Sequence, residues 1–115
     1  MKKDINILNV AKKVFEIESN EIKNLSNRLT SDFEDAVRTI YNSKGKLIVS
    51  GIGKSGIIGK KIAATCASTG TPSFFLHPGE AYHGDLGMIE KKDVVLLISN
   101  SGETDEILKL IPFLT

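Results

Sequence analysis

The stretch that most constrains the fold is residues 46–70, where a short apolar run leads into a glycine-rich turn and then into a helical pattern. Residues 47–49 are apolar, too few for a helix and rich in β-branched side chains, so they are predicted to form a buried strand. Ile58, Ile62 and Cys66 follow at i, i+4 and i+8, which predicts a helix with one face packed on a sheet. The stretch is therefore predicted to be one βα unit.

The turn between the strand and the helix carries Gly51, Gly53 and Gly56. Glycine allows a tight turn and brings main-chain N–H groups close to a ligand, and the new helix adds unpaired donors and a positive dipole end. An anion is the expected ligand. The ATP-binding P-loop is excluded because its first required glycine falls on Ile48.

The dinucleotide fingerprint Gly-x-Gly-x-x-Gly is matched by the three glycines, but the second strand should then end in an acidic residue. It ends instead at Leu76-His77-Pro78. Dinucleotide binding stays open as the weaker alternative. A site for a smaller phosphorylated ligand is the favoured one.

The rest of the chain completes a parallel α/β sheet. Residues 73–76 and 94–98 are predicted as the second and third strands, residues 77–87 as a strandless segment, and a last helix follows residue 104. Ligands in such sheets bind beyond the carboxyl ends of the strands, which here are residues 51–55, 77–83 and 99–104. The polar and glycine-rich residues are therefore expected on one rim of the sheet.

Composition describes an ordinary globular domain. The chain has 115 residues, 41% hydrophobic and 25% charged, and its 15 basic and 14 acidic side chains give a net charge of +1. This balance offers no argument for nucleic acid or membrane partners. The single cysteine, Cys66, is interpreted as a small buried apolar residue. With no run of 18 apolar residues and no signal-peptide core after Met1, the chain is expected in the cytoplasm.

Two helices are predicted before the first strand. Residues 4–29 repeat apolar side chains every seven positions, at Leu8, Phe15, Ile22 and Leu29, which suits packing on the domain or on a subunit partner equally well. A second helix is expected after Thr30, where Ser31 and Glu34 have capping-box spacing. The expected division is a helical segment at 1–45 and the α/β part at 46–115.

Four motifs resemble a known family: GIGKSG at 51–56, ASTGTPS at 67–73, HPGEAYHGDLG at 77–87 and SNSGET at 99–104. They resemble the sugar isomerase (SIS) domain of bacterial D-arabinose 5-phosphate isomerases, and the segment 77–87 is the most specific of them. The resemblance implies a three-layer flavodoxin-like parallel sheet of strand order 2-1-3-4-5. Here it would be truncated to about three strands and preceded by two helices.

The resemblance also implies a function. Family members interconvert D-ribulose 5-phosphate and D-arabinose 5-phosphate, the first step toward the Kdo sugar of lipopolysaccharide or capsule. They are cytoplasmic homo-oligomers, usually tetramers, and the resemblance implies no organic cofactor and no metal. Since family members continue with further strands and often with CBS modules, the chain is expected to be an incomplete fragment that is inactive alone. The alternative is a non-catalytic SIS module that binds a sugar phosphate and regulates another activity.

Site residues are carried over motif by motif. Lys54, His83 and Glu106 match the active-site positions. The resemblance places phosphate binding at five further positions: Gly53, Ser55, Ser99, Ser101 and Thr104. Aldose–ketose isomerisation moves a proton between C1 and C2 through an enediol, so it requires a base and donors for the developing oxyanion. Glu106 suits the proton shuttle, Lys54 the polarisation of the carbonyl or binding of the phosphate, and His83 ring opening or proton transfer.

Overall fold

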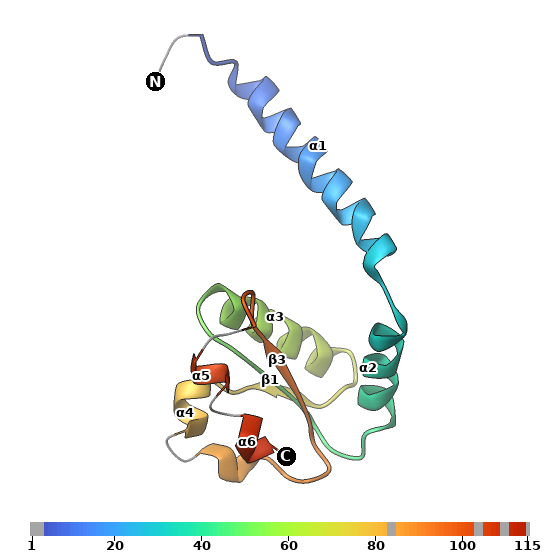
Figure 1. Ribbon diagram of the computed structural model, residues 1–115, viewed down its shortest axis with the longest axis vertical. Helices are drawn as coiled ribbons and strands as arrows, with labels where there is room; N and C mark the ends of the chain where they lie inside the picture. Colours follow the sequence, from blue (N-terminus) through green and yellow to red (C-terminus); the bar gives the residue numbers. More distant parts are fainter. Residues whose placement is uncertain (1–3, 83–84, 103–104, 109–110, 115) are drawn as a thin grey trace. The chain divides into compact units, whose positions relative to one another are not determined.

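The computed structural model describes residues 4–82, 85–102, 105–108 and 111–114, and the chain forms two compact units, Met1–Val37 and Arg38–Thr115. In chain order the elements are α1 (Ile7–Leu25), the 3₁₀ turn η1 (Ser26–Arg28), α2 (Ser31–Asn42), β1 (Leu47–Gly51), α3 (Lys54–Ser68), β2 (Ser73–Phe75), α4 (Pro78–Tyr82), η2 (Asp85–Met88), β3 (Val94–Ile98), α5 (Asp105–Leu108) and α6 (Ile111–Leu114) (Figure 1).

The N-terminal unit contains α1 and the first half of α2, and α2 continues into the second unit, so both predicted helices are present. The apolar side chains of the seven-residue repeat are exposed, from 58% at Leu29 to 72% at Leu8. The second helix begins at Ser31, and the hydroxyl of Thr30 accepts a hydrogen bond of 3.3 Å from the N–H of Asp32. This cap lies one residue before the start of the expected capping box.

The second unit is organised around a three-stranded parallel sheet of order β2-β1-β3. Val49 of β1 pairs with Phe75 of β2, and Gly51 pairs with Ile98 of β3. The predicted parallel sheet and its order 2-1-3 are therefore confirmed. Every residue of β1 is buried, whereas those of β2 and β3 are only partly buried, because β1 has a neighbour on both sides.

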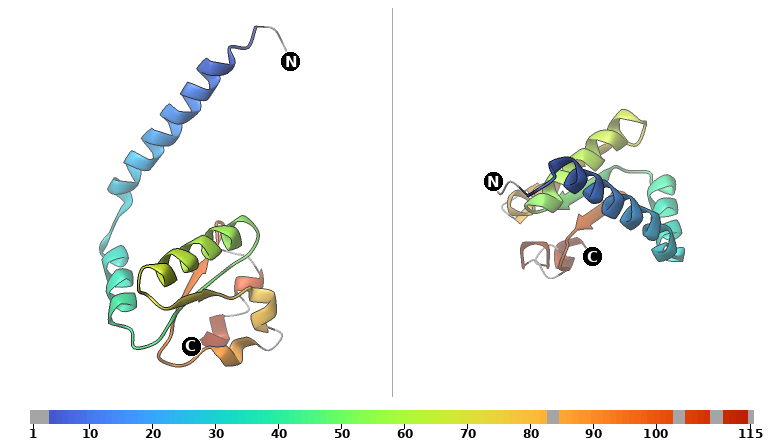
Figure 2. Two further views of the ribbon diagram at one scale, coloured as in Figure 1. Left: turned by 180° about the vertical axis from the view of Figure 1, so that it is seen from behind. Right: turned by 90° about the horizontal axis from the view of Figure 1, so that it is seen from above.

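The sheet is covered on both faces by helices. On one face Leu47 and Val49 form a cluster with Ala63 of α3, which runs along the sheet (Figure 2). On the other face Ile48 packs with Leu76 and with Ala81 of α4. The alternation of β1 side chains between two apolar clusters explains why residues 47–49 are all apolar.

The buried face of α3 agrees only in part with the predicted one, because Ile62 and Cys66 pack against the apolar cluster on this face whereas Ile58 does not. The helix begins at Lys54, and its buried residues are Gly56, Gly59 and Ala63, while Ile58 is 56% exposed. A Cβ at Gly59 would lie 3.1 Å from both Val49 Cγ1 and Phe75 Cε1. The helix thus makes its closest approach to the sheet at its smallest residues, which an argument from large apolar side chains overlooks.

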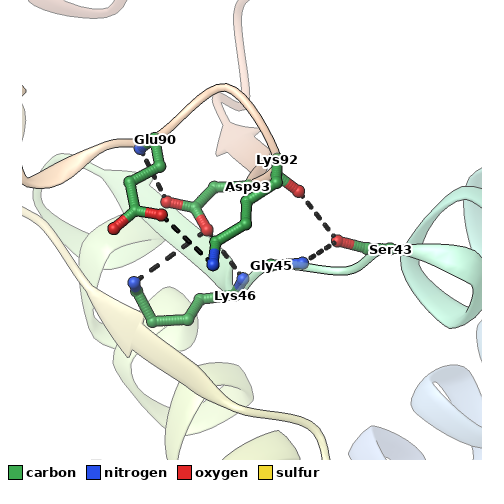
Figure 3. A network of polar contacts seen from close by, with 6 residues as sticks. All are labelled: Ser43, Gly45, Lys46, Glu90, Lys92 and Asp93. Atoms are coloured by element: carbon green, nitrogen blue, oxygen red, sulfur yellow. Dashed lines mark hydrogen bonds and ion pairs between the residues drawn. The ribbon is translucent and has the colours of Figure 1, made fainter.

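The amino ends of β1 and β3 are joined by polar contacts (Figure 3). The Asp93 carboxylate accepts a hydrogen bond of 2.7 Å from the N–H of Lys46. The Ser43 hydroxyl donates to the Lys92 carbonyl oxygen at 3.1 Å and accepts from the N–H of Gly45 at 3.0 Å. These bonds hold together two turns that are almost fifty residues apart in sequence.

The segment after β2 contains no strand in its described residues, as predicted, but it includes the short helix α4 and the 3₁₀ turn η2, which the sequence analysis did not foresee. The predicted last helix is described as two short helices, α5 and α6. Across the described ranges of both units, none of the helices has the length and apolar character needed to cross a membrane.

Candidate functional site

The first part of the candidate site is the turn from β1 into α3. Gly53 is the N-cap of α3, with a φ of 61° and a ψ of −130°, a conformation that only glycine adopts readily. A Cβ placed on it would meet no atom within 4 Å, so its surroundings are open. Because a glycine cap has no side-chain acceptor, the first-turn N–H groups of α3 are suited to an external anion. Lys54 is exposed and Ser55 partly buried at this turn.

The second part is the turn that follows β3. Its Ser99 hydroxyl oxygen accepts a hydrogen bond of 3.0 Å from the N–H of Gly102. Gly102 has a φ of 71°, and a Cβ on it would also meet no atom within 4 Å. Ser101, between them, is exposed. This turn therefore resembles the first one, since both combine hydroxyls with a left-handed glycine that faces open space.

Strand register brings the two turns together. The last residue of β1, Gly51, is the partner of the last residue of β3, Ile98, so the turns begin at the same level of the sheet. A Cβ on Gly51 would lie 3.1 Å from the carbonyl oxygen of Ile98 and 3.1 Å from that of Ser55. The structure thus places five of the predicted residues in two neighbouring turns at one rim: Gly53, Lys54, Ser55, Ser99 and Ser101.

The same rim receives the end of β2. The N–H of Leu76 donates to the Val49 carbonyl oxygen at 2.8 Å, and α4 follows two residues later. Helix α4 contacts α5, which carries Glu106 as its second residue (Figure 1). The backbone position of Glu106 is therefore at this rim, close to the strandless segment. Two further predicted residues, His83 and Thr104, lie outside the described residues.

The arrangement suits a phosphate in chemical terms. A phosphate oxygen accepts hydrogen bonds from hydroxyls and main-chain N–H groups, and the lysine ammonium compensates its charge. Lys54, at the start of α3, also adds to the positive end of the helix dipole. Sequence reasoning found these turns because each follows an apolar strand, and ligands of parallel sheets bind beyond the carboxyl ends of the strands.

Two residues near the rim carry contacts that the sequence analysis missed. The buried hydroxyl of Ser50 donates to the Leu76 carbonyl oxygen at 2.5 Å, and Nδ1 of His77 accepts from the N–H of Gly79 at 3.0 Å. In the sequence these contacts are indicated only by a serine within an apolar strand and by a histidine before a proline.

A pocket of about 240 Å³ lies away from this rim, near the amino ends of β1 and β2. It is lined by Ile40, Tyr41, Ser43, Gly45, Gly70, Thr71 and Pro72. None of the predicted site residues lines it. The candidate site is therefore the rim at the carboxyl ends of the strands.

Comparison with known proteins gives consistent results. Residues 39–115 match the family model of the SIS domain. The chain is 58% identical over 103 residues to the arabinose 5-phosphate isomerase KdsD of Yersinia pestis, a match that covers 90% of this chain and 31% of the relative. It is 59% identical over 98 residues to the arabinose 5-phosphate isomerase KpsF of Escherichia coli O6:H1, covering 84% of this chain and 30% of that protein.

Among solved structures, the chain is similar to Escherichia coli CFT073 c3406 in complex with arabinose 5-phosphate, with a TM-score of 0.80 and 48% identity. That match covers 96% of this chain and 60% of the solved one. The resemblance expected from the motifs is therefore confirmed over most of the chain. The chain spans about a third of the length of the curated relatives that it matches.

Proposed function

This chain belongs to the SIS domain family, and we propose that it carries the sugar-phosphate site of an isomerase that interconverts D-ribulose 5-phosphate and D-arabinose 5-phosphate. The observation that carries the proposal is the identity of 58% and 59% to two arabinose 5-phosphate isomerases, over stretches that include most of the chain. The neighbouring glycine turns at the ends of β1 and β3 support a phosphate site.

In this proposal the phosphate binds between the two turns. Its oxygens accept hydrogen bonds from the hydroxyls of Ser55, Ser99, Ser101 and Thr104 and from main-chain N–H groups beside Gly53. The positive φ values of Gly53 and Gly102 support this, because bare glycine backbone allows a ligand to approach closely. The sugar then extends from the phosphate toward the segment that contains α4 and α5.

The reaction requires no external oxidant, since C1 is oxidised as C2 is reduced or the reverse. The carboxylate of Glu106 takes the proton from C1 of the ketose and returns it to C2, while the Lys54 ammonium stabilises the oxygen of the enediolate. His83 assists by opening the furanose ring of the aldose or by moving a proton between the two oxygens. Helix α4 ends just before His83 in the sequence and contacts α5, which carries Glu106, and this contact supports the proposal that these two groups act together.

We further propose the setting in which the enzyme works. It acts in the cytoplasm as a homo-oligomer, on the route to the Kdo sugar of lipopolysaccharide or capsule, with residues 1–45 as the helical segment and residues 46–115 as part of the SIS domain. The apolar seven-residue repeat at Leu8, Phe15 and Ile22 of α1 supports a contact with a second subunit, because such a repeat favours packing between helices.

Binding to the isolated chain tests the site. We expect arabinose 5-phosphate to shift the NMR amide signals of Gly53, Ser55 and Gly102, and arabinose without phosphate at the same concentration to leave them unchanged. Ser55→Ala should weaken the affinity about 10- to 100-fold, as expected for one lost hydrogen bond to a charged group. The control Ser68→Ala, at the far end of α3, should bind as the unaltered chain does.

Two results would count against the proposal. One is a set of shifts confined to the pocket at the amino ends of the strands. The other is an equal response to arabinose and to arabinose 5-phosphate, because the site would then not recognise the phosphate.

A further inference from the structure

The path of the chain out of β2 is fixed by β1 through both main-chain groups of Leu76. Its N–H donates to the Val49 carbonyl oxygen at 2.8 Å, and its carbonyl oxygen accepts from the hydroxyl of Ser50 at 2.5 Å. Ser50 is 2% exposed and Leu76 5% exposed. Hydrogen bonds in such a dry environment are strong, so the next residue, His77, begins from a well-defined position.

His77 turns the chain into α4. Its Nδ1 accepts a hydrogen bond of 3.0 Å from the N–H of Gly79, and its carbonyl oxygen accepts one of 3.0 Å from the N–H of Ala81. Pro78 occupies the first helical position, where a missing N–H has no cost. His77 therefore caps α4 with an imidazole in the place where serine or aspartate is usual. Nδ1 accepts only when the ring is neutral and its proton is on Nε2.

Helix α4 ends next to one residue of the proposed reaction in the sequence and contacts the helix that carries another. Ala81 is 1% exposed and packs against Ile48 and Leu76, so α4 is anchored in the core. The helix ends at Tyr82, next to His83 in the sequence, and it contacts α5, which carries Glu106. A change at the start of α4 would therefore disturb the positions of His83 and Glu106, the two groups proposed to act on the sugar.

We propose that His77 is a positioning residue for the isomerase, which holds α4 through Nδ1 and so keeps the segment before His83 and the start of α5 in place. The inference rests on the proposed function, because it assigns no contact between His77 and the substrate. In this proposal Nε2 of His77 neither donates a hydrogen bond nor transfers a proton to the substrate. This distinction can be tested with asparagine, whose Oδ1 has the same place relative to Cγ as Nδ1 of histidine and also accepts a hydrogen bond.

Turnover is measured in a chimera in which this chain replaces the stretch of Yersinia pestis KdsD that it matches. We expect His77→Ala to lower kcat about 10-fold with KM changed less than 2-fold, and His77→Asn to restore kcat to within about 3-fold of the unaltered chimera. An unchanged kcat in His77→Ala, or equal losses in both variants, would overturn the inference.

The cap itself is measured in the 115-residue chain, independently of turnover. We expect nitrogen-15 spectra to place the ring proton of His77 on Nε2, as an accepting Nδ1 requires. We also expect the exchange protection of the Gly79 amide to be lost in His77→Ala and kept in His77→Asn. If the Gly79 amide stays protected in His77→Ala as well as in His77→Asn, the inference is overturned. If the unaltered chimera is inactive while the amide of Gly79 is protected as described, the proposed function fails and the cap stands.

Discussion

The Asp93 carboxylate, just before β3, accepts a hydrogen bond of 2.7 Å from the main-chain N–H of Lys46, just before β1. Its second oxygen accepts one of 2.8 Å from the N–H of Glu90, and the Lys46 ammonium lies 4.0 Å away. The Asp93 side chain is 0% exposed. These contacts join the amino ends of the two strands whose carboxyl ends lead into the glycine turns of the proposed phosphate site (Figure 3).

The Asp93 network predicts a dependence of stability on pH. The main-chain N–H groups of Lys46 and Glu90 lower the pKa of Asp93 below its ordinary value of 3.8. A lowered folded-state pKa contributes stability that is fully present above the unfolded value and is lost as the pH falls through the folded value. The free energy of unfolding should therefore decrease below about pH 4, as measured by urea denaturation between pH 7 and pH 2.

Asp93→Asn should lower the free energy of unfolding at pH 7 by about 1–3 kcal/mol, because the amide nitrogen cannot accept the second hydrogen bond. The difference from the unaltered chain should shrink in acid. Glu90→Gln is the matched control. It keeps the main-chain donor and loses only an exposed ion pair with Lys92, worth at most about 1 kcal/mol. If the free energy of unfolding changes with pH in the same way for the unaltered chain and for Asp93→Asn, this account is contradicted.

Glycine substitutions in α3 should rank by what the new methyl group meets. At Gly59 it would lie 3.1 Å from two side chains, so Gly59→Ala should cost about 1–3 kcal/mol, partly offset by the higher helix propensity of alanine. At Gly56 it would lie 2.7 Å from the main-chain oxygen of Gly51, which cannot rotate away. Gly56→Ala should therefore destabilise the chain more and also weaken sugar-phosphate binding. Equal urea midpoints for the two variants would argue against this packing.

The buried hydroxyl of Ser50 should contribute to stability. Ser50→Ala leaves the Leu76 carbonyl oxygen without this donor, so the free energy of unfolding should fall by about 1–3 kcal/mol. Ser68→Ala removes an exposed hydroxyl and should change it by less than about 0.5 kcal/mol. Thermal unfolding of both variants checks the difference. A Ser50→Ala chain as stable as the unaltered one would show that this bond is dispensable.

Lys54 should matter for the reaction and not for the fold. It is exposed at the first turn of α3, so Lys54→Met should leave the unfolding curve nearly unchanged. In the chimera it should lower kcat/KM about 100-fold, the usual loss when one donor to a developing oxyanion is removed. Lys61→Met, which removes another exposed lysine of α3, is the control and should retain activity. Similar activity in both variants would exclude the proposed role of Lys54.

The sequence predicted the elements that depend on apolar runs and glycine turns. The third strand agrees with Val94–Ile98, and the first two strands differ only in the extent of their ends. The rim at the carboxyl ends followed from the parallel order of the strands, which is why Gly53 and Ser99 were predicted as neighbours.

Other features could not be predicted because their determinants are local contacts. Helix α3 packs through Gly56 and Gly59, residues to which hydrophobic periodicity gives no weight, so Ile58 was wrongly placed on its buried face. The helix α4 has five residues and depends on a histidine cap and on Ala81 in the core. Neither feature leaves a periodic pattern in the sequence.

The central claim is tested most directly by following D-ribulose 5-phosphate with NMR in the presence of the chimera described above. We expect arabinose 5-phosphate to form. We expect Glu106→Gln to reduce its formation by a factor of about 100 to 10,000, as for the loss of a general base. Asp105→Asn, a change of the adjacent exposed carboxylate, should leave the rate nearly unchanged. A folded chimera that binds the sugar phosphate but forms no product, while intact KdsD does, would contradict the claim and favour a non-catalytic sugar-phosphate sensor.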